Sequence, residues 1–459
     1  MSTRVWLFKI MRLQRPACIA LFGVLLAGCD EVQRIGDRAR PATPHERYEQ
    51  SLQRAGLDQT VLGRAWLRAA RHAIAVPVSI SLPYTEATYF PAEEARASAY
   101  RVVARRGQRL IVNVQSAAGS GAGVFVDLFA LAHDGMLHSV EAARLDTGSL
   151  SLSRDGDTDS SYVVRIQPEL LESARVTVNV RVEPLLSFPL PGAGNRNVQS
   201  FWGAARDGGR RQHQGVDIFA PRGTPVLAVA PGVISHVGTS RLGGNVVFLR
   251  DAQRGQNIYY AHLDQQLVRN GQRVDPGDTI GTVGTTGNAR GGVPHLHFGI
   301  YRRGQGAIDP FHFIRREELV AVEVRADTSL FGTRARNRMA AVDVRAGPNA
   351  KSPSTARLDR DAPFDIAGAS GDWFHIRTAT GIAGYIAARS VVPATQAIRV
   401  VSARTGDIVR ERPDSLAVVM DSLTAGAELS VLGTLDGFLL VRTPGGNTGW
   451  IAGRNNGSQ

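Results

Sequence analysis

The chain contains very little cysteine and almost no lysine. Only two cysteines, Cys18 and Cys29, occur among 459 residues, which excludes a disulfide framework as the source of stability. After residue 28 the only lysine is Lys351, so arginine supplies nearly all of the positive charge, and the net charge of the whole chain is +12. The arginines are scattered and accompany no nucleic-acid-binding motif, so we expect no nucleic acid as a partner. A basic surface suits anionic lipids or anionic polymers.

Long apolar runs are missing as well. The N-terminal apolar run, residues 17–27, is shorter than the roughly 20 residues that a transmembrane helix needs. It follows a basic segment and ends in Leu26-Ala27-Gly28-Cys29, which is the arrangement of a signal peptide. This ending resembles a bacterial lipoprotein signal, which implies that residues 1–28 are removed and that Cys29 carries lipid. We therefore expect a cell-envelope protein anchored by its N-terminal lipid in a membrane facing the periplasm, inner or outer. A plain secretory signal or an uncleaved anchor is the alternative.

The N-terminal half changes its periodicity near residue 76. Residues 29–42 are polar and are predicted to form a tether. Thr43-Pro44-His45-Glu46 is a capping box with proline at the first helical position, and it opens a helical hairpin over residues 43–75. Residues 76–184 alternate with a period of two between Gly/Ser/Asp turns, which predicts a β-sandwich.

Four histidines and one aspartate form the most informative pattern. His295 and His297 are two apart, so on a strand both imidazoles lie on one face, about 6.6 Å apart. His213 and Asp217 can bind one ion only if the chain curls between them, and Gly215 makes such a bend inexpensive. His262 stands alone in Tyr260-Ala261-His262-Leu263. Together these side chains predict a zinc site with its own acid/base groups.

From about Ser187 to Phe313 the sequence resembles the lysostaphin-type zinc endopeptidases, which cut peptide bonds in peptidoglycan. The histidine motifs carry this resemblance, together with further short motifs in the family order: Gly223-Thr224-Pro225-Val226, Gly244-Asn245, Gly281-x-Val283-Gly284 and Asp309-Pro310. The resemblance implies one zinc per chain bound by His213, Asp217 and His297, with His262 and His295 as the catalytic pair. One departure lies in residues 287–293, a longer segment than the family's usual turn before His-x-His.

Each motif alone has a less specific interpretation. A single His-x-His is more often a pair of half-exposed residues, and the zinc interpretation depends on all the motifs occurring together and in order. His236, His312 and His375 lack such a context and are predicted to be structural or surface histidines.

A repeat follows at a spacing of 65 residues. Val344-Arg345-x-x-Pro348 recurs as Val409-Arg410-x-x-Pro413, and Gly384-Tyr385-Ile386-Ala387 recurs as Gly449-Trp450-Ile451-Ala452. Two copies of one small β-rich unit are therefore predicted, and each resembles a bacterial SH3-like domain. The aromatic side chains at these positions either line a ligand groove or fill the barrel.

The predicted protein is mainly β and multidomain: a helical hairpin, a β-sandwich, a lysostaphin-type β-sheet catalytic domain and two small SH3-like barrels. The catalytic domain is expected over residues 185–318, a linker over 319–335, and the SH3-like domains over 336–394 and 395–459. The expected function is that of a membrane-anchored, zinc-dependent endopeptidase of peptidoglycan cross-links, with peptidoglycan, a membrane and envelope regulators as partners. The alternatives are a non-catalytic scaffold that activates a cell-wall amidase and a zinc peptidase of envelope proteins.

Overall fold

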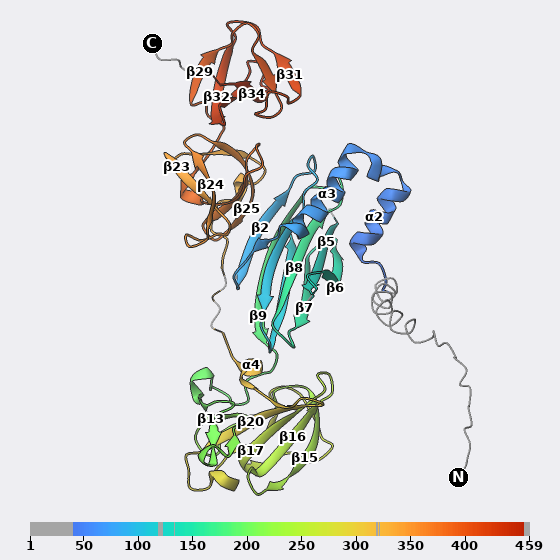
Figure 1. The fold of residues 1–459 in the computed structure, drawn as a ribbon, viewed down its shortest axis with the longest axis vertical. Helices are drawn as coiled ribbons and strands as arrows, with labels where there is room; N and C mark the ends of the chain where they lie inside the picture. Colours follow the sequence, from blue (N-terminus) through green and yellow to red (C-terminus); the bar gives the residue numbers. More distant parts are fainter. Residues whose placement is uncertain (1–39, 118–122, 133, 318–319, 321, 454–459) are drawn as a thin grey trace, which may run out of the picture.

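The computed structural model describes residues 40–117, 123–132, 134–317, 320 and 322–453. The predicted signal segment, Cys29 and most of the tether lie outside these residues. The described part is mainly β and consists of several sheets (Figure 1), which confirms the predicted fold class. Within it, no helix is long and apolar enough to cross a membrane.

Two helices cover one side of the central sandwich. Helix α2 (Pro44–Arg54) begins at the predicted capping box, in which the Thr43 and Glu46 side chains each accept a hydrogen bond from the other's backbone N–H. Helix α3 (Val61–Ala75) carries the buried Trp66, whose Nε1 donates to the Pro168 carbonyl at 2.9 Å. This contact fixes the helices to a strand of the sandwich (Figure 1).

The sandwich contains two sheets. Burial alternates along residues 84–90 and 174–182 of one sheet, whereas residues 124–128 and 162–168 of the other are buried at every position. One sheet has the order β1-β3-β8-β5-β6, and β2-β9-β4-β7 belongs to the other. The strands are β1 (Val78–Ser79), β2 (Tyr84–Phe90), β3 (Ser98–Ala104), β4 (Gln108–Ser116), β5 (Val124–Leu131), β6 (Leu137–Leu145), β7 (Ser149–Asp155), β8 (Ser160–Pro168) and β9 (Ala174–Pro184).

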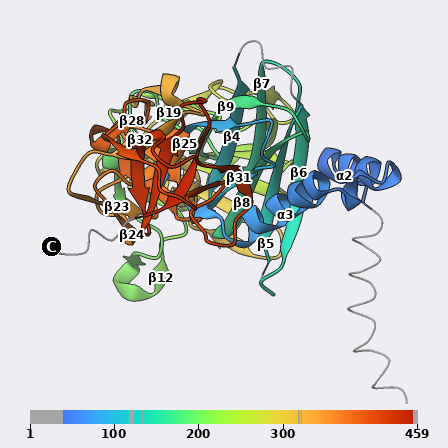
Figure 2. The same ribbon diagram turned by 90° about the horizontal axis from the view of Figure 1, so that it is seen from above.

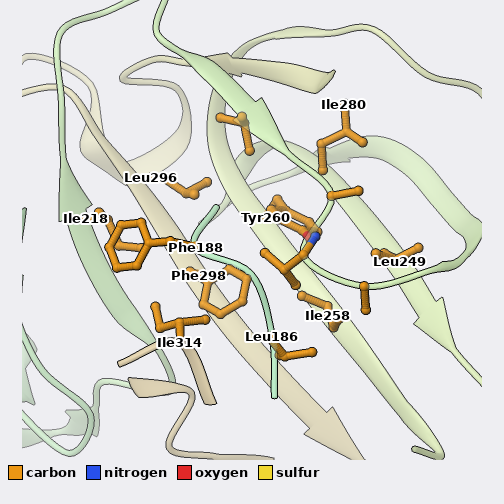
Figure 3. Packing of buried hydrophobic residues seen from close by; sticks show 14 of the residues in the cluster. Leu186, Phe188, Ile218, Leu249, Ile258, Tyr260, Ile280, Leu296, Phe298 and Ile314 are labelled. Carbon is orange, nitrogen blue, oxygen red and sulfur yellow. The ribbon is translucent and has the colours of Figure 1, made fainter. Parts of the chain in front are cut away.

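The next domain is built on an antiparallel sheet in which β20 lies between β13 and β17. Its apolar side chains form one core with Leu186, Tyr260 and Phe298 buried inside (Figure 3). The elements are β10 (Val198–Ser200), β11 (Ala205–Arg206), β12 (Arg211–Gln212), β13 (Val216–Phe219), β14 (Pro225–Leu227), β15 (Gly232–Ser240), β16 (Gly244–Asp251), β17 (Gln256–Gln266), β18 (Arg273–Val274), β19 (Thr279–Val283), β20 (His295–Arg302), β21 (Gly306–Ile308) and the short helix α4 (Phe311–Ile314).

This domain is attached to one end of the sandwich. Gly107 of the sandwich lies so close to α4 that a Cβ atom there would be 2.3 Å from the His312 carbonyl. The Arg254 guanidinium lies 3.3 Å from the Asp155 carboxylate at the end of β7. Backbone and ion-pair contacts therefore join the two parts around α4.

Two small β-barrels follow, as the repeat predicts. Ala326 and Phe331, which lie in the predicted linker, are buried in the core of the first barrel. Tyr385 and Trp450 occupy equivalent positions and are 0% and 2% exposed. Tyr385 hydrogen-bonds to the sandwich, and Trp450 packs in the cluster that contains the core of the first barrel, so both side chains lie at junctions between domains. The strands are β22 (Arg334–Asn337), β23 (Ala341–Arg345), β24 (Ser354–Asp359), β25 (Pro363–Ser370), β26 (Trp373–Arg377), β27 (Ala383–Ala387), β28 (Val391–Pro393), β29 (Arg399–Ser402), β30 (Ile408–Arg410), β31 (Val419–Ser422), β32 (Glu428–Leu435), β33 (Phe438–Arg442) and β34 (Thr448–Ala452).

The first barrel is joined to the sandwich through a shared sheet. Strand β25 pairs antiparallel with β2, with Ala87 opposite Ala369 and Thr88 opposite Gly368. A Cβ atom at Gly368 would lie 2.7 Å from the Glu86 carboxylate, so only glycine permits this approach. One sheet therefore runs from the sandwich into the barrel.

A buried carboxylate lies at this junction. Glu86 is 0% exposed and accepts hydrogen bonds from the Tyr84 hydroxyl, from the Tyr385 hydroxyl at 2.8 Å and from His375 Nδ1 at 2.9 Å. Burial raises the pKa of Glu86, but the attraction of His375 and these hydrogen bonds outweigh it, so the net pKa lies below its ordinary value. The ionised carboxylate thus binds the barrel to the sandwich.

We expect Glu86→Gln to weaken this junction at neutral pH. The folded-state pKa of Glu86 is depressed, so its charge stabilises the fold above the unfolded pKa of about 4.3, and this contribution is lost as the pH falls through the folded pKa. The melting temperature of the wild type should therefore exceed that of the variant at pH 7, and the difference should shrink towards pH 3. Truncating one partner of such a buried pair costs about 3 kcal/mol or more, so Glu86→Ala should lower the melting temperature further than Glu86→Gln does.

Glu93→Gln is the matched control, because Glu93 is an exposed glutamate in the loop after β2. Equal melting temperatures for Glu86→Gln and the wild type across this pH range would show that the carboxylate does not stabilise the junction.

Candidate metal centre and active site

Strand pairing brings the predicted site residues together from three strands. In the β13–β20 ladder Asp217 lies opposite His297, and in the β17–β20 ladder Ala261 lies opposite the same His297. His262 is the next residue on β17, and His213 precedes β13 by three residues. The central position of β20 therefore gathers side chains that are up to 84 residues apart in sequence.

Three of these side chains have the spacing of ligands to one ion. His213 Nε2 lies 2.9 Å from His297 Nδ1, and Asp217 Oδ1 lies 3.0 Å from each of those nitrogens. Tetrahedral ligands at about 2 Å from zinc are separated by about 3.3 Å, so the three atoms need only small shifts to bind it. Two imidazoles and one carboxylate, with a fourth position left for water, fit a catalytic zinc site.

Gly215 has a different role from the one that we expected. We predicted that it eases a bend between His213 and Asp217. A Cβ atom at this position would lie 2.7 Å from the His297 imidazole and 2.6 Å from the Phe298 carbonyl. Glycine is therefore required here because β20 passes so close.

Two of the candidate ligands are held by neighbouring polar groups. His213 Nδ1 lies 3.0 Å from the Phe201 carbonyl, to which it donates, and Nε2 is then left as the electron-pair donor for a metal. Asp217 turns Oδ1 towards the histidines, while its Oδ2 accepts a hydrogen bond from Arg206 Nη2 at 2.6 Å. The same guanidinium nitrogen contacts the Ser200 hydroxyl at 2.6 Å. Arg206 was not singled out in the sequence, because no motif marks it among so many arginines.

The site favours an ionised Asp217 and a neutral His297. Burial raises the pKa of Asp217, but hydrogen bonds from His213 and His297 outweigh this effect and hold the pKa well below its ordinary value. Burial lowers the pKa of His297, although the Asp217 carboxylate opposes that shift. These are the protonation states that metal ligands require.

His262 and His295 face the same cleft and lie beside the candidate ligands. Their ring centroids are 5.0 Å apart, and His295 Nε2 is 3.9 Å from Asp217 Oδ1. Each Nδ1 is within hydrogen-bond distance of a backbone carbonyl, that of Thr286 at 2.9 Å for His262 and that of Val293 at 2.8 Å for His295. When each Nδ1 donates its proton, each Nε2 becomes an acceptor.

The backbone at His262 is strained. Its φ is +61°, a left-handed conformation that is uncommon outside glycine. The backbone N–H of His262 donates to the Gly243 carbonyl at 2.7 Å and stabilises this geometry. Burial, followed by repulsion from His295 and His297, lowers the pKa of His262 to about 4. Strain and a perturbed pKa at one residue are typical of functional positions.

The five residues line a cleft of about 810 Å³. The β11–β12 hairpin contributes to its lining, and so do Leu242, Asn288, Ala289 and Val293. Residues 287–293, the departure from the family pattern, thus contribute to the cleft.

Comparison with known protein families identifies matches for the peptidase domain and for the two barrels. Residues 211–310 match Peptidase family M23, and residues 340–392 and 405–455 match the bacterial SH3 domain. The chain therefore contains an M23 peptidase domain followed by two bacterial SH3 domains, which confirms the resemblance seen in the sequence. M23 peptidases are metallopeptidases.

Several curated relatives match part of the chain. The chain is 39% identical over 143 residues to the L-Ala–D-Glu endopeptidase of Bacillus subtilis, covering 29% of this chain and 44% of that protein. It is 42% identical over 91 residues to the peptidoglycan DD-endopeptidase ShyC of Vibrio cholerae, covering 19% and 20%. The lipoprotein YgeR of Escherichia coli, itself uncharacterized, is 40% identical over 109 residues, covering 24% and 40%.

A solved structure, the catalytic domain of lysostaphin from Staphylococcus simulans, is 34% identical and covers 26% of this chain and 92% of that domain, with a TM-score of 0.23. The chain spans less than half the length of each of the three curated relatives.

Arg206 supplies a test of the metal centre that does not depend on activity. A polar group that orients a ligand commonly contributes about 10–100-fold to metal affinity. Arg206→Ala should therefore raise the zinc dissociation constant by about 10-fold or more, as measured by competition with a chromogenic chelator, while Arg206→Lys should recover part of the affinity. Arg269→Ala, an exposed arginine of the same domain that does not line the cleft, is the control. Unchanged zinc affinity in Arg206→Ala would contradict the role of this contact.

Proposed function

We propose that this protein is a zinc-dependent endopeptidase that hydrolyses peptide cross-links of peptidoglycan at the cleft between β13, β17 and β20. The observation that carries the proposal is the convergence of His213, Asp217 and His297 at ligand spacing beside His262 and His295. The endopeptidase names of the Bacillus and Vibrio relatives support peptidoglycan as the substrate. A scaffold without activity would not need all five side chains.

The chain's own groups account for the proton transfers of peptide hydrolysis. A zinc ion held here would polarise the scissile carbonyl and lower the pKa of a water molecule towards neutrality. His295, with Nε2 facing the cleft, is placed to accept the proton of the attacking water and to return it to the leaving amine. His262 presents the same kind of acceptor nitrogen and orients that water. The carbonyls of Thr286 and Val293 keep both rings in this orientation.

Digestion of purified sacculi tests the proposed function. The wild type should release soluble peptides that mass spectrometry identifies, and a chelator should abolish the release until zinc is restored. His213→Ala and Asp217→Ala should lose both zinc and activity. His262→Ala and His295→Ala should keep zinc and the fold but lose about 10²–10⁴-fold in turnover, the usual contribution of an acid/base group.

Two outcomes would contradict this assignment. Full zinc content in both ligand variants would remove those residues from the metal site. Full activity in His262→Ala or His295→Ala would remove that residue from the mechanism.

We further propose that the protein is a lipoprotein of the cell envelope, anchored through Cys29. The support is the Leu26-Ala27-Gly28-Cys29 ending, and the Escherichia coli relative also carries the name lipoprotein. Cys29→Ser should block labelling by a radioactive fatty acid and release the protein from the membrane pellet. Cys18→Ser is the matched control and should leave labelling intact. Continued sedimentation of Cys29→Ser with the membrane after a mild salt wash would point to another tether.

A further inference from the structure

The face of the peptidase sheet that carries His297 also carries a row of rings. His236 on β15 lies opposite Phe248 on β16. Phe248 in turn lies opposite Tyr259 on β17, and Tyr259 lies opposite Gly299 on β20. Paired residues share one face of a sheet, and Gly299 is two residues from His297, so its position belongs to that face as well. The row therefore crosses four strands that are neighbours in the sheet (Figure 1).

Ring contacts connect this row to the cleft. The Tyr259 ring centroid is 5.7 Å from that of His297 and 4.6 Å from that of Phe248. Tyr301, two residues beyond Gly299 on β20, has its ring centroid 6.0 Å from Tyr259 and 6.4 Å from Phe248. Both tyrosines line the cleft. We call Phe248, Tyr259 and Tyr301 the aromatic row, and it continues the cleft from the candidate metal centre towards β16.

Two glycines let the tyrosine rings rest against the backbone. A Cβ atom at Gly299 would lie 3.5 Å from Tyr301 Cε2, so the Tyr301 ring reaches back over this glycine. A Cβ atom at Gly243 would collide with the Tyr259 hydroxyl oxygen. The three side chains of the aromatic row are half-buried. Part of each ring surface is therefore open to a ligand.

Polar side chains lie beside the rings on the same face. Arg250 is paired with Asn257, and Asn257 is paired with Tyr301. Both polar side chains are exposed, and neither has a hydrogen-bonding partner in the part of the chain that the structure describes. A sugar ring has C–H groups on one face, which can stack on the negative face of an aromatic ring. Its hydroxyl and acetamido groups need donors and acceptors at the edge, which amide and guanidinium groups supply.

The position of the aromatic row suits a sugar attached to the substrate peptide. Phe248 is two residues along and two strands across from His297, which corresponds to about 12 Å. About four extended residues span that distance. The β11–β12 hairpin contacts the sheet at Asp217 of β13, on the other side of β20, and the β12 segment projects from the body of the molecule (Figure 2). The row and this hairpin thus lie on different sides of β20.

We propose that the aromatic row, with Asn257 and Arg250 at its edge, is a subsite for a sugar ring of the glycan strand that carries the scissile peptide. The inference rests on the proposed peptidase function and adds the glycan to the part of the substrate that is recognised. The sugar stacks on Phe248 and Tyr301 while the peptide runs past Tyr259 to the metal centre. This arrangement gives a peptide attached to sugar an advantage over the same peptide without it.

Two forms of one probe test the subsite. Cross-linked dimers that carry the disaccharide are released from sacculi with a muramidase, and a portion is freed of sugar with an amidase. Both forms are then N-acetylated, so that removal of the sugar leaves no additional charged amine. We expect the full-length wild type to cleave the sugar-bearing form with a kcat/KM about 10-fold above that of the sugar-free form, because stacking on the rings adds to its binding.

Variants of the row test which residues provide this preference. Phe248→Leu/Tyr301→Leu keeps apolar cross-strand contacts but removes two ring faces, so the ratio of the two kcat/KM values should fall towards 1, mainly through a higher KM for the sugar-bearing form. Tyr301→Phe keeps the ring and should keep most of the preference. Asn257→Ala removes an exposed side chain and should lose part of the preference, so the test does not depend on the folding of the double variant. Leu267→Ala, which truncates an exposed apolar side chain of the same domain outside the cleft, should keep the wild-type ratio.

A binding measurement separates failure of this inference from failure of the proposed function. Both forms of the probe are titrated into the His295→Ala protein by calorimetry, where the sugar-bearing form should bind more tightly and the double leucine substitution should abolish the difference. Cleavage of both forms with equal kcat/KM by the wild type would overturn the subsite. An equal loss on both forms in the double leucine variant would overturn it as well, since the rings would then contact the peptide or only support the sheet. If the wild type cleaves neither form, the peptidase function fails, and the binding preference alone decides whether the subsite exists.

Discussion

The register of β20 between β13 and β17 is the constraint on which the active site depends. Because β20 is paired on both sides, His297 has fixed neighbours, Asp217 on one strand and Ala261 on the other. A slip of one residue on β20 would turn both of its histidines to the opposite face of the sheet. Such a slip would also expose Leu296 and Phe298, which are fully buried in the core of Figure 3. Apolar packing and the geometry of the site are therefore enforced by the same alternation along one strand.

A second constraint is the attachment of the first SH3 domain to the sandwich. Its strand β25 pairs with β2 of the sandwich, and its Tyr385 and His375 side chains donate hydrogen bonds to Glu86. A module bound in this way has less freedom than a tethered wall-binding domain, and removing it would take away the Tyr385 and His375 partners of the Glu86 carboxylate. The second SH3 domain packs on the first one through Leu432 and Leu435. In Figure 1 the first SH3 domain lies beside the upper part of the sandwich, and the second lies above the first, at the end of the molecule away from the peptidase domain.

The cleft combines candidate metal ligands with a proposed acid/base pair from neighbouring strands. The candidate ligands come from β20, from β13 and from the residues just before it, and the proposed acid/base pair comes from β17 and the start of β20. Arg206, on the β11–β12 hairpin, contacts the candidate ligand Asp217. This hairpin is therefore connected to the candidate metal centre through one ion pair.

The sequence by itself determined the features that depend on local periodicity and on the order of motifs. Alternation of period two predicted the strands, the capping box predicted the start of α2, the 65-residue spacing predicted two barrels, and the histidine motifs predicted the side chains that share the cleft. These features depend on residues close together in the chain, or on a pattern distinctive enough to be recognised. Only the tertiary structure decided the role of Gly215, the contact between Arg206 and Asp217, and the junction at Glu86. Glu86 and His375 are 289 residues apart, and no local propensity links two strands that meet only when separate domains pack together.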